Sequence, residues 1–318
     1  MLQFLKALLC LAGFSLPLCG LAANYAYITN QGEHTVSVID IEQQQVIKTL
    51  AVGKAPVGVT IDQQQHKVYV SNVEGRSLSV IDMLSQQVIN TIPLSISPVG
   101  ITLNKTGDRL YVADWYHANV LVIAADSGKT LAEIEVGKAP GGLQLSSDGA
   151  MLYVANRDSN DVSVVDTHTN KQMHRIKVGQ HPFGLGLSQD AQQLLVVNVY
   201  SNSIYVIDTR SNQVVNTLAT GNHPYCVTTD RSGRLFVTNT GEDSVSVFDL
   251  ASQKLIRKIR VPGTPEGIAY DAEHEQVLVA SWMDNVIAVI DSQSLTLKKE
   301  IKVGSQPRAF GQFTGSLR

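Results

Sequence analysis

Residues 67–82 read KVYVSNVEGRSLSVID, and close variants of this text return along the whole chain after residue 23. The text holds two motifs, one of the Tyr-Val-x-Asn type and one of the Val-Ser-Val-Ile-Asp type. The first motif ends at Asn30, Asn72, Asp114, Asn156, Asn198, Asn239 and Ser281. A third motif, Gly-x-x-Pro-x-Gly or a variant, has its proline at Pro56, Pro98, Pro140, Pro182, Pro224, Pro265 and Pro307. The spacing is 42 residues, and once 41, so the chain contains seven repeats.

Each repeat alternates apolar and polar residues, as β-strands do, and shows no helical periodicity. In one repeat the strands are expected at Gly58–Ile61, Lys67–Asn72, Ser77–Asp82 and Gln87–Ile92. Four short strands in about 40–45 residues are typical of one blade of a β-propeller. The sequence therefore predicts an all-β, seven-bladed β-propeller with four antiparallel strands per blade.

The two ends of the repeat region are expected to share one blade. The chain enters at Asn24 in a second strand and ends with Pro307–Phe313, which reads as a first strand without a successor. Pairing these ends would close the ring and leave no open sheet edge. A solenoid is the alternative, but it needs atypical capping repeats, and the sequence shows none.

The repeat resembles the YVTN-type β-propeller family, to which the exported YncE-like proteins belong. The motifs Ala26–Asn30, AYITN, and Leu235–Asn239, LFVTN, carry this resemblance most clearly, and it covers residues 24–313. It implies an exported propeller. Relatives of this type include surface proteins and the propeller parts of periplasmic amine dehydrogenases and haem nitrite reductases, so the resemblance does not select one function.

The N-terminus reads as a secretory signal peptide, residues 1–23. One cation, Lys6, precedes an apolar run of about 12 residues, which is shorter than the ~20 of a membrane span. Small residues follow, and cleavage is expected near Ala22 or Ala23. The expected mature chain, residues 24–318, is a single periplasmic domain with no transmembrane segment. An extracellular or cell-surface location is the alternative.

Composition excludes several classes of protein. Charged residues make up 17% and hydrophobic residues 44% of the chain, which excludes an intrinsically disordered protein. The formal net charge of −3 argues against nucleic acid as a partner. No Cys-x-x-Cys-His motif is present, so covalent c-type haem is not expected. We expect a monomer.

The candidate site lies where the repeats depart from their consensus. In a propeller, the loops between blades and the loops between second and third strands meet on one face, around the mouth of the channel. Aromatic and charged residues gather in these loops on one half of the ring, and such residues anchor partners. The candidate binding residues are Trp115, Tyr116, His117, His181, Phe183, Tyr200, His223, Tyr225, Glu266, Trp282 and Arg308. The alternative is that the loops vary without function.

A copper or zinc site at His181, His223 and Cys226 is a second expectation for this region. The two histidines occupy one repeat position in adjacent blades and are expected side by side, and imidazole and thiolate bind these metals. The competing interpretation is that Cys226 only fills a position that requires a small residue. His274, in contrast, is expected to lie in a solvated turn between strands.

Three functions remain open from the sequence. The first is a binding or scaffold protein that presents its channel mouth to a periplasmic protein partner or a small ligand, as an accessory of a redox or catabolic pathway. The second is a metal-assisted lyase or lactonase, with His181 or His223 as base or ligand, Glu266 as general acid or base and Arg308 as anion stabiliser. The third is a structural cell-surface repeat protein.

Overall fold

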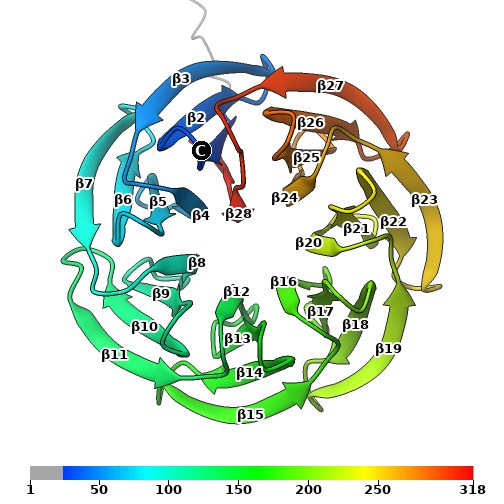
Figure 1. Cartoon of the computed structure of the whole chain (residues 1–318), viewed down its shortest axis with the longest axis horizontal. Coiled ribbons are helices and arrows are strands. Elements are labelled where there is room, and N and C mark those ends of the chain that lie inside the picture. The colour runs from blue at the N-terminus through cyan, green and yellow to red at the C-terminus, as the bar shows by residue number, and fades with distance from the viewer. Residues whose placement is uncertain (1–23, 318) are drawn as a thin grey trace, which may run out of the picture.

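The computed structural model describes residues 24–317, and the expected signal peptide lies outside these residues. The described chain forms 29 strands, arranged as seven sheets around a central axis (Figure 1). The predicted seven-bladed propeller with four antiparallel strands per blade is confirmed. Within residues 24–317, no helix has the length and apolar character needed to cross a bilayer.

Six blades are built from consecutive strands, of which the first lies at the channel and the fourth at the rim (Figure 1). The first three of these blades consist of β4 (Pro56–Asp62), β5 (Lys67–Asn72), β6 (Ser77–Asp82), β7 (Gln87–Pro93); β8 (Pro98–Leu103), β9 (Arg109–Asp114), β10 (Asn119–Ala124), β11 (Thr130–Glu135); and β12 (Pro140–Leu145), β13 (Met151–Asn156), β14 (Asp161–Asp166), β15 (Lys171–Lys177). The next three consist of β16 (Pro182–Leu187), β17 (Gln193–Asn198), β18 (Ser203–Asp208), β19 (Gln213–Ala219); β20 (Pro224–Thr229), β21 (Arg234–Asn239), β22 (Ser244–Asp249), β23 (Lys254–Arg260); and β24 (Pro265–Asp271), β25 (Gln276–Ser281), β26 (Val286–Asp291), β27 (Thr296–Lys302).

Both ends of the described chain contribute to the seventh blade, as the repeat pattern predicts. Its outer strands are β1 (Asn24–Asn30), β2 (Thr35–Asp40) and β3 (Gln45–Ala51), and its inner strand is β29 (Thr314–Ser316). Strands β29 and β1 pair antiparallel, with Asn24 opposite Ser316. The ring is therefore closed by hydrogen bonds between its two ends.

The inner strand of this blade differs from the predicted continuous strand over Pro307–Phe313. Pro307 forms a single bridge to Asn30, and β28 (Phe310–Gly311) pairs in parallel with β4 of the next blade. The regular pairing with β1 begins only at Thr314. The physical reason is the backbone: Ala309 and Gly311 have φ values of 52° and 99°, which interrupt an extended strand.

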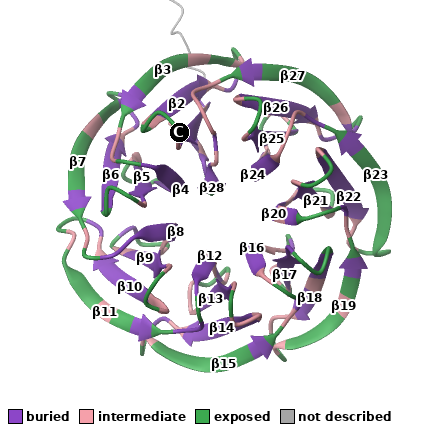
Figure 2. Ribbon diagram, viewed as in Figure 1, coloured by how far each residue is buried: buried purple, intermediate pink, exposed green. Residues whose placement is uncertain are grey.

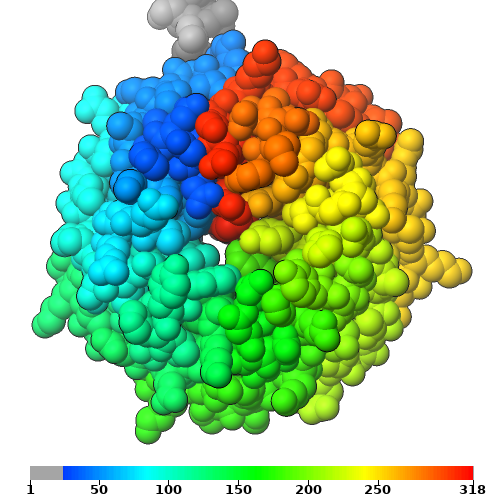
Figure 3. Space-filling view, viewed as in Figure 1, coloured from blue at the N-terminus to red at the C-terminus, as the bar shows by residue number. Residues whose placement is uncertain are grey.

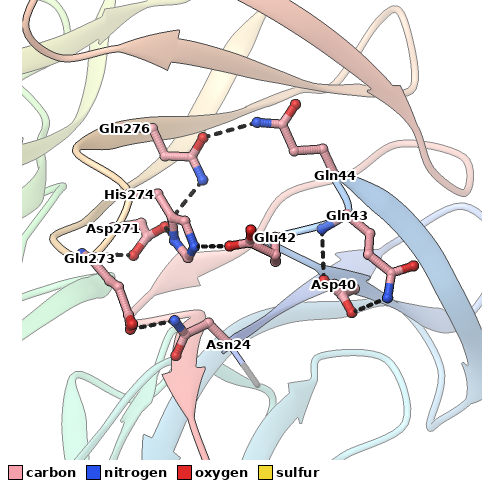
Figure 4. A network of polar contacts seen from close by, with 9 residues as sticks. All are labelled: Asn24, Asp40, Glu42, Gln43, Gln44, Asp271, Glu273, His274 and Gln276. Atoms are coloured by element: carbon pink, nitrogen blue, oxygen red, sulfur yellow. Dashed lines mark hydrogen bonds and ion pairs between the residues drawn. The ribbon is translucent and has the colours of Figure 1, made fainter. Parts of the chain in front are cut away.

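A polar network on the face opposite to the channel mouth adds a second link across the closure. His274, in the turn after β24, places Nδ1 2.6 Å from Asp271 and Nε2 2.7 Å from Glu42, which follows β2 in the closing blade (Figure 4). Asn24 also contacts Glu273 in that turn (Figure 4). The expectation of a solvated His274 is therefore wrong, because its side chain is only 24% exposed between two carboxylates.

The core lies between the blades, and the strands at the rim are exposed along most of their length (Figure 2). The tyrosine of the first motif is fully buried in four blades, as Tyr27, Tyr69, Tyr111 and Tyr153. Burial of side chains of this size is the main favourable contribution to the stability of such a domain.

The asparagine of the first motif explains why the two motifs occur together. Asn72 Nδ2 donates to Ser77 Oγ at 3.1 Å and to Ser79 Oγ at 3.0 Å, and Asn239 bonds Ser244 and Ser246 in the same way. A buried amide needs such partners, because an unsatisfied polar group destabilises the fold. The Ser-x-Ser at the start of the third strand therefore satisfies the Nδ2 group of the Asn, while the buried Oδ1 of Asn72 has no hydrogen-bond partner in the described part of the chain.

Candidate functional site

The channel mouth is formed by two sets of loops, as expected from the repeats. The loops that join one blade to the next lie beside the loops between second and third strands. In one blade, the Val73 amide donates to Ala55 O and the Gly75 amide donates to Lys54 O, both at 3.0 Å. We call this side of the molecule the mouth face and the other side the opposite face.

The two histidines that precede a repeat proline, His181 and His223, have fixed backbones. The His181 amide donates to Asn160 Oδ1 at 2.9 Å, and the His223 amide donates to Asn202 Oδ1 at 2.8 Å. Both histidines adopt a positive φ, 52° and 50°. Ala55 holds the same backbone conformation at this repeat position. The loop geometry is therefore common to the repeats, while the side chain is free to vary.

Four side chains from adjacent blades form a continuous stack on the mouth face. The Arg157 guanidinium lies 5.9 Å from the ring centre of Trp115 and 6.0 Å from that of Tyr200. Tyr200 also stacks on His181 with a centroid distance of 4.1 Å, and it lies perpendicular to the His223 ring with a centroid distance of 5.5 Å. Tyr200 is 53% exposed. The stack thus joins a cation and three flat rings on an accessible surface.

Arg157 belongs to this stack but was not among the residues predicted from the sequence. It follows Asn156, and so holds the repeat position that Trp115 and Trp282 hold in their own blades. That shared position was the available signal, because every residue there lies on the mouth face. Arg157 also pairs with Asp158 at 2.6 Å.

A second cluster surrounds a buried ion pair. Arg308 Nη1 donates to both carboxylate oxygens of Glu266, at 2.9 and 2.7 Å, and Arg308 Nε donates to Gln31 Oε1 at 2.6 Å. The same guanidinium lies 5.7 Å from the Trp282 ring centre and 5.8 Å from that of Phe310. Burial raises the pKa of Glu266 to about 7, although Arg308 acts in the opposite direction. Glu266 therefore changes its charge near neutral pH.

Three aromatic rings narrow the channel at the mouth. Phe183 lies 4.5 Å from Tyr225 and 5.1 Å from Phe310, between ring centres, and Tyr225 lies 5.5 Å from Phe310. These residues come from β16, β20 and β28, so the contact reaches across the axis (Figure 1). A narrow opening remains at the centre of the molecule (Figure 3). Phe310 was missed because it lies three residues after a repeat proline, inside an expected strand, and not in the loops that were compared between repeats.

The candidate residues divide into three groups by exposure. The exposed ones are Tyr116, His117, Tyr200 and His223; the half-buried ones are Trp115, His181, Tyr225, Trp282 and Arg308; and the buried ones are Phe183, Glu266 and Cys226. Tyr116 is 71% exposed, and the His117 ring lies 2.7 Å from Asp114. The candidate residues thus form a partly exposed aromatic rim around a partly filled centre.

The side chains proposed as metal ligands do not converge. Tyr200 contacts both His181 and His223, and so lies between the two rings that were expected side by side. Burial raises the pKa of the Cys226 thiol far above its ordinary value, so it stays protonated. Among residues 24–317, no group of three or more His, Cys, Asp or Glu side chains is placed to hold a metal ion. The copper or zinc site stays a prediction without support from the geometry.

The fold and the mouth face together define a seven-bladed propeller whose mouth-face loops carry the residues that vary from repeat to repeat. The chain belongs to the SMP-30/gluconolactonase/LRE-like region family, whose model matches residues 56–265. The narrower resemblance to YncE-like proteins stays a prediction. No curated protein sequence gives a significant match.

Solved structures with the same fold come from several kinds of protein. Hydrazine synthase of Kuenenia stuttgartiensis is 19% identical, with a TM-score of 0.75, and the match covers 84% of this chain and 92% of that one. A functionally unknown protein of Desulfotomaculum acetoxidans is 15% identical, with a TM-score of 0.76 and coverage of 91% and 100%. A streptogramin B lyase is 15% identical, with a TM-score of 0.70 and coverage of 81% and 90%. At these identities, the similarity shows the fold alone.

Proposed function

We propose that this protein is an exported propeller that binds a partner protein or a small ligand through its mouth face. The observation that carries the proposal is the partly exposed stack of Trp115, Arg157, Tyr200 and His181. Trp, Tyr and Arg are the residue types that contribute most to binding energy at interfaces. A rim of this kind suits a partner that offers a negative charge beside a flat apolar surface.

The asymmetry of the ring supports the same proposal. Val57 and Val99 occupy the position after the proline in two adjacent blades, whereas Phe183 and Tyr225 occupy it on the other side. Phe183 is buried in one cluster with Val57 and Val99, but Tyr225 is half-buried, and the exposed Tyr200 and His223 lie on the same half of the ring. An accessible aromatic surface on one half of the mouth supports the proposal.

The test compares two variants in a binding experiment with periplasmic extract. The double variant Trp115→Ala/Arg157→Ala removes the stack, and Arg210→Ala, in an exposed turn of the opposite face, is the matched control. We expect the double variant to retain the melting temperature of the wild type. We expect it to capture at least ten-fold less partner, because the loss of hot-spot residues weakens binding by this order. Equal capture by the double variant and the wild type would overturn the proposal.

Export is part of this proposal and has its own test. N-terminal sequencing of protein from the periplasmic fraction should begin at residue 23 or 24. Retention of residues 1–23 on a protein that fractionates with the cytoplasm would contradict export.

A lactonase- or lyase-type enzyme is the second candidate function, and two observations favour it. The chain belongs to a family named in part for gluconolactonase, and Glu266 has a pKa of about 7 beside Arg308, which suits a general acid or base. This candidate predicts turnover of a lactone panel that is lost in Glu266→Gln. If the protein turns over none of the lactones in the panel, this candidate function is excluded.

A further inference from the structure

A cavity of about 640 Å³ occupies the channel between the aromatic cluster and the opposite face. Its walls are the first strands of the blades, and its lining extends to Gln64 and Lys105 in the turns of the opposite face. Phe183 and Phe310 lie at its mouth end. The volume falls within the range of about 300–1,000 Å³ that is usual for small-molecule sites.

One level of this cavity is a ring of seven residues that share one repeat position: six lie in the first strands of the six regular blades, and Gly311 lies in β28, which pairs with β4. They lie four positions after the repeat proline and are Thr60, Thr102, Gln144, Gly186, Thr228, Ala269 and Gly311. Four of the seven carry a hydroxyl or amide group, and the other three are too small to fill the channel. The level therefore combines polar groups on some sides with free space on others.

Several polar side chains of the lining have free hydrogen-bonding capacity. In the described part of the chain, the side chains of Thr102, Thr228, Tyr270 and Gln312 make no hydrogen bond to protein. The first three are half-buried, so they are shielded from bulk water on one side. Half-buried polar groups of this kind favour a ligand or ordered water that completes their hydrogen bonds.

The charge of the lining restricts the ligand. Asp62 and Lys105 are the two charged residues of the lining, and both lie toward the opposite face. Asp62 Oδ1 accepts from the Gln64 and Gln65 amides at 2.9 Å, its buried Oδ2 has no hydrogen-bond partner among the described residues, and Lys105 is exposed. A charged ligand deeper in the cavity would meet no opposite charge, and its desolvation would be unfavourable.

Apolar side chains complete the walls beside the polar ring. Leu103, Leu143, Leu185 and Leu187 line the cavity and are only half-buried. Hydroxyl and amide groups next to aliphatic surface match a molecule with polar edges and apolar faces.

We propose that this cavity is a second ligand site, distinct from the mouth face, for an uncharged polyhydroxylated molecule of about one or two sugar rings. The ligand enters from the opposite face and hydrogen-bonds to the polar ring at Thr102 and Thr228. The inference does not depend on the function of the mouth face.

The test uses calorimetric titration with D-glucose, D-galactose, myo-inositol and trehalose, and with D-glucuronate as the charged counterpart of glucose. We expect saturable binding of at least one neutral probe and at least ten-fold weaker binding of glucuronate. Absence of binding by all four neutral probes would mean a cavity that holds only water, and would overturn the inference.

Isosteric variants locate the binding in the cavity. Thr102→Val and Thr228→Val each remove one hydroxyl at nearly constant volume, and each should weaken binding about five- to ten-fold. Thr217→Val, on the exposed strand β19, is the matched control and should bind as the wild type does. Trp115→Ala/Arg157→Ala should also leave this binding unchanged, which separates the cavity from the mouth face. Wild-type affinity in both folded cavity variants would overturn the inference.

Discussion

Single residues at the mouth face show how environment decides chemistry. Glu266 and Cys226 lie in the same crowded region, and burial raises the pKa of both groups. Arg308 pairs with the carboxylate of Glu266, so that group can still ionise near neutral pH, whereas the thiol stays neutral. Cys226, which was a candidate metal ligand, is therefore unreactive, and its buried neighbour Glu266 is the group that changes its charge near neutral pH.

The pKa of Glu266 predicts a pH-dependent stability. The folded-state pKa is about 7 against an ordinary 4.5, so the fold favours the protonated form. The contribution of protonated Glu266 to the stability of the fold is complete below pH 4.5 and is lost as the pH rises through 7. Chemical denaturation of Glu266→Gln and of the wild type should be compared from pH 4.5 to 8. As the pH rises, the free energy of unfolding of the variant should increase relative to that of the wild type. A pH-independent difference would contradict the assignment.

The thiol of Cys226 should be unreactive in the folded protein. It is buried and its pKa is raised, so the reactive thiolate is scarce. Iodoacetamide should label the native protein hardly at all and the denatured protein fully, as mass spectrometry would show. Rapid labelling of the native protein would mean that the thiol is accessible.

At the scale of the strand, the repeat positions set which residues can be tolerated. The position two after the repeat proline faces the backbone of the next blade: a Cβ at Gly142 would lie 2.0 Å from Phe183 O. Cys226 and Ala309 hold the same position in other blades. The sequence interpretation that Cys226 fills a position for a small residue agrees with this packing.

Gly142→Ala should therefore destabilise the fold more than Gly149→Ala. The first change forces a methyl group against backbone and should decrease the free energy of unfolding by about 2–3 kcal/mol. Gly149 lies in a turn at φ 77°, and no atom lies within 4 Å of the place that a Cβ would occupy. Gly149→Ala should therefore decrease the free energy of unfolding by about 1 kcal/mol, because of the positive φ alone. Urea denaturation of the two variants provides the comparison, and equal effects would be inconsistent with the packing described.

The strands also mark the limit of what the sequence could predict. Repeat counting assigned Trp115, His181 and Tyr200 to the mouth face, because loop position follows from blade geometry. It did not predict the contact of Phe183 with Phe310, since side chains that cross the channel are not encoded in the repeat. The broken strand at Ala309 was missed for a related reason, because a positive φ at alanine leaves no mark in the sequence pattern.

For the whole molecule, stability depends on the closure between the two ends of the chain. Strand β29 pairs with β1 over three residue pairs inside the closing blade, and the His274 network links the β24–β27 blade to the closing blade on the opposite face (Figure 4). Burial alone would lower the pKa of His274, but its hydrogen bonds to Glu42 and Asp271 outweigh burial and raise the pKa. Protonated His274 thus supports the closure.

His274→Ala should weaken this closure in a pH-dependent manner. Since the folded-state pKa is raised, the stabilisation is complete below the ordinary pKa of 6.5 and is lost as pH rises through the folded value. The decrease in melting temperature should be larger at pH 6 than at pH 9. His168→Ala, in an exposed turn of another blade, is the control and should have little effect at either pH. A decrease in melting temperature that is the same at both pH values for His274→Ala would argue against a contribution of protonated His274 to the closure.

The central claim is that the mouth face holds the partner, and site-specific photo-crosslinking in intact cells tests it most directly. A photoreactive phenylalanine analogue replaces Tyr116, which is exposed beside the stack, or Arg210, on the opposite face. The account predicts a defined crosslinked species from position 116 that is absent from position 210 and disappears in Trp115→Ala/Arg157→Ala. Crosslinks from position 210 alone, or a species at position 116 that persists in the double variant, would contradict it.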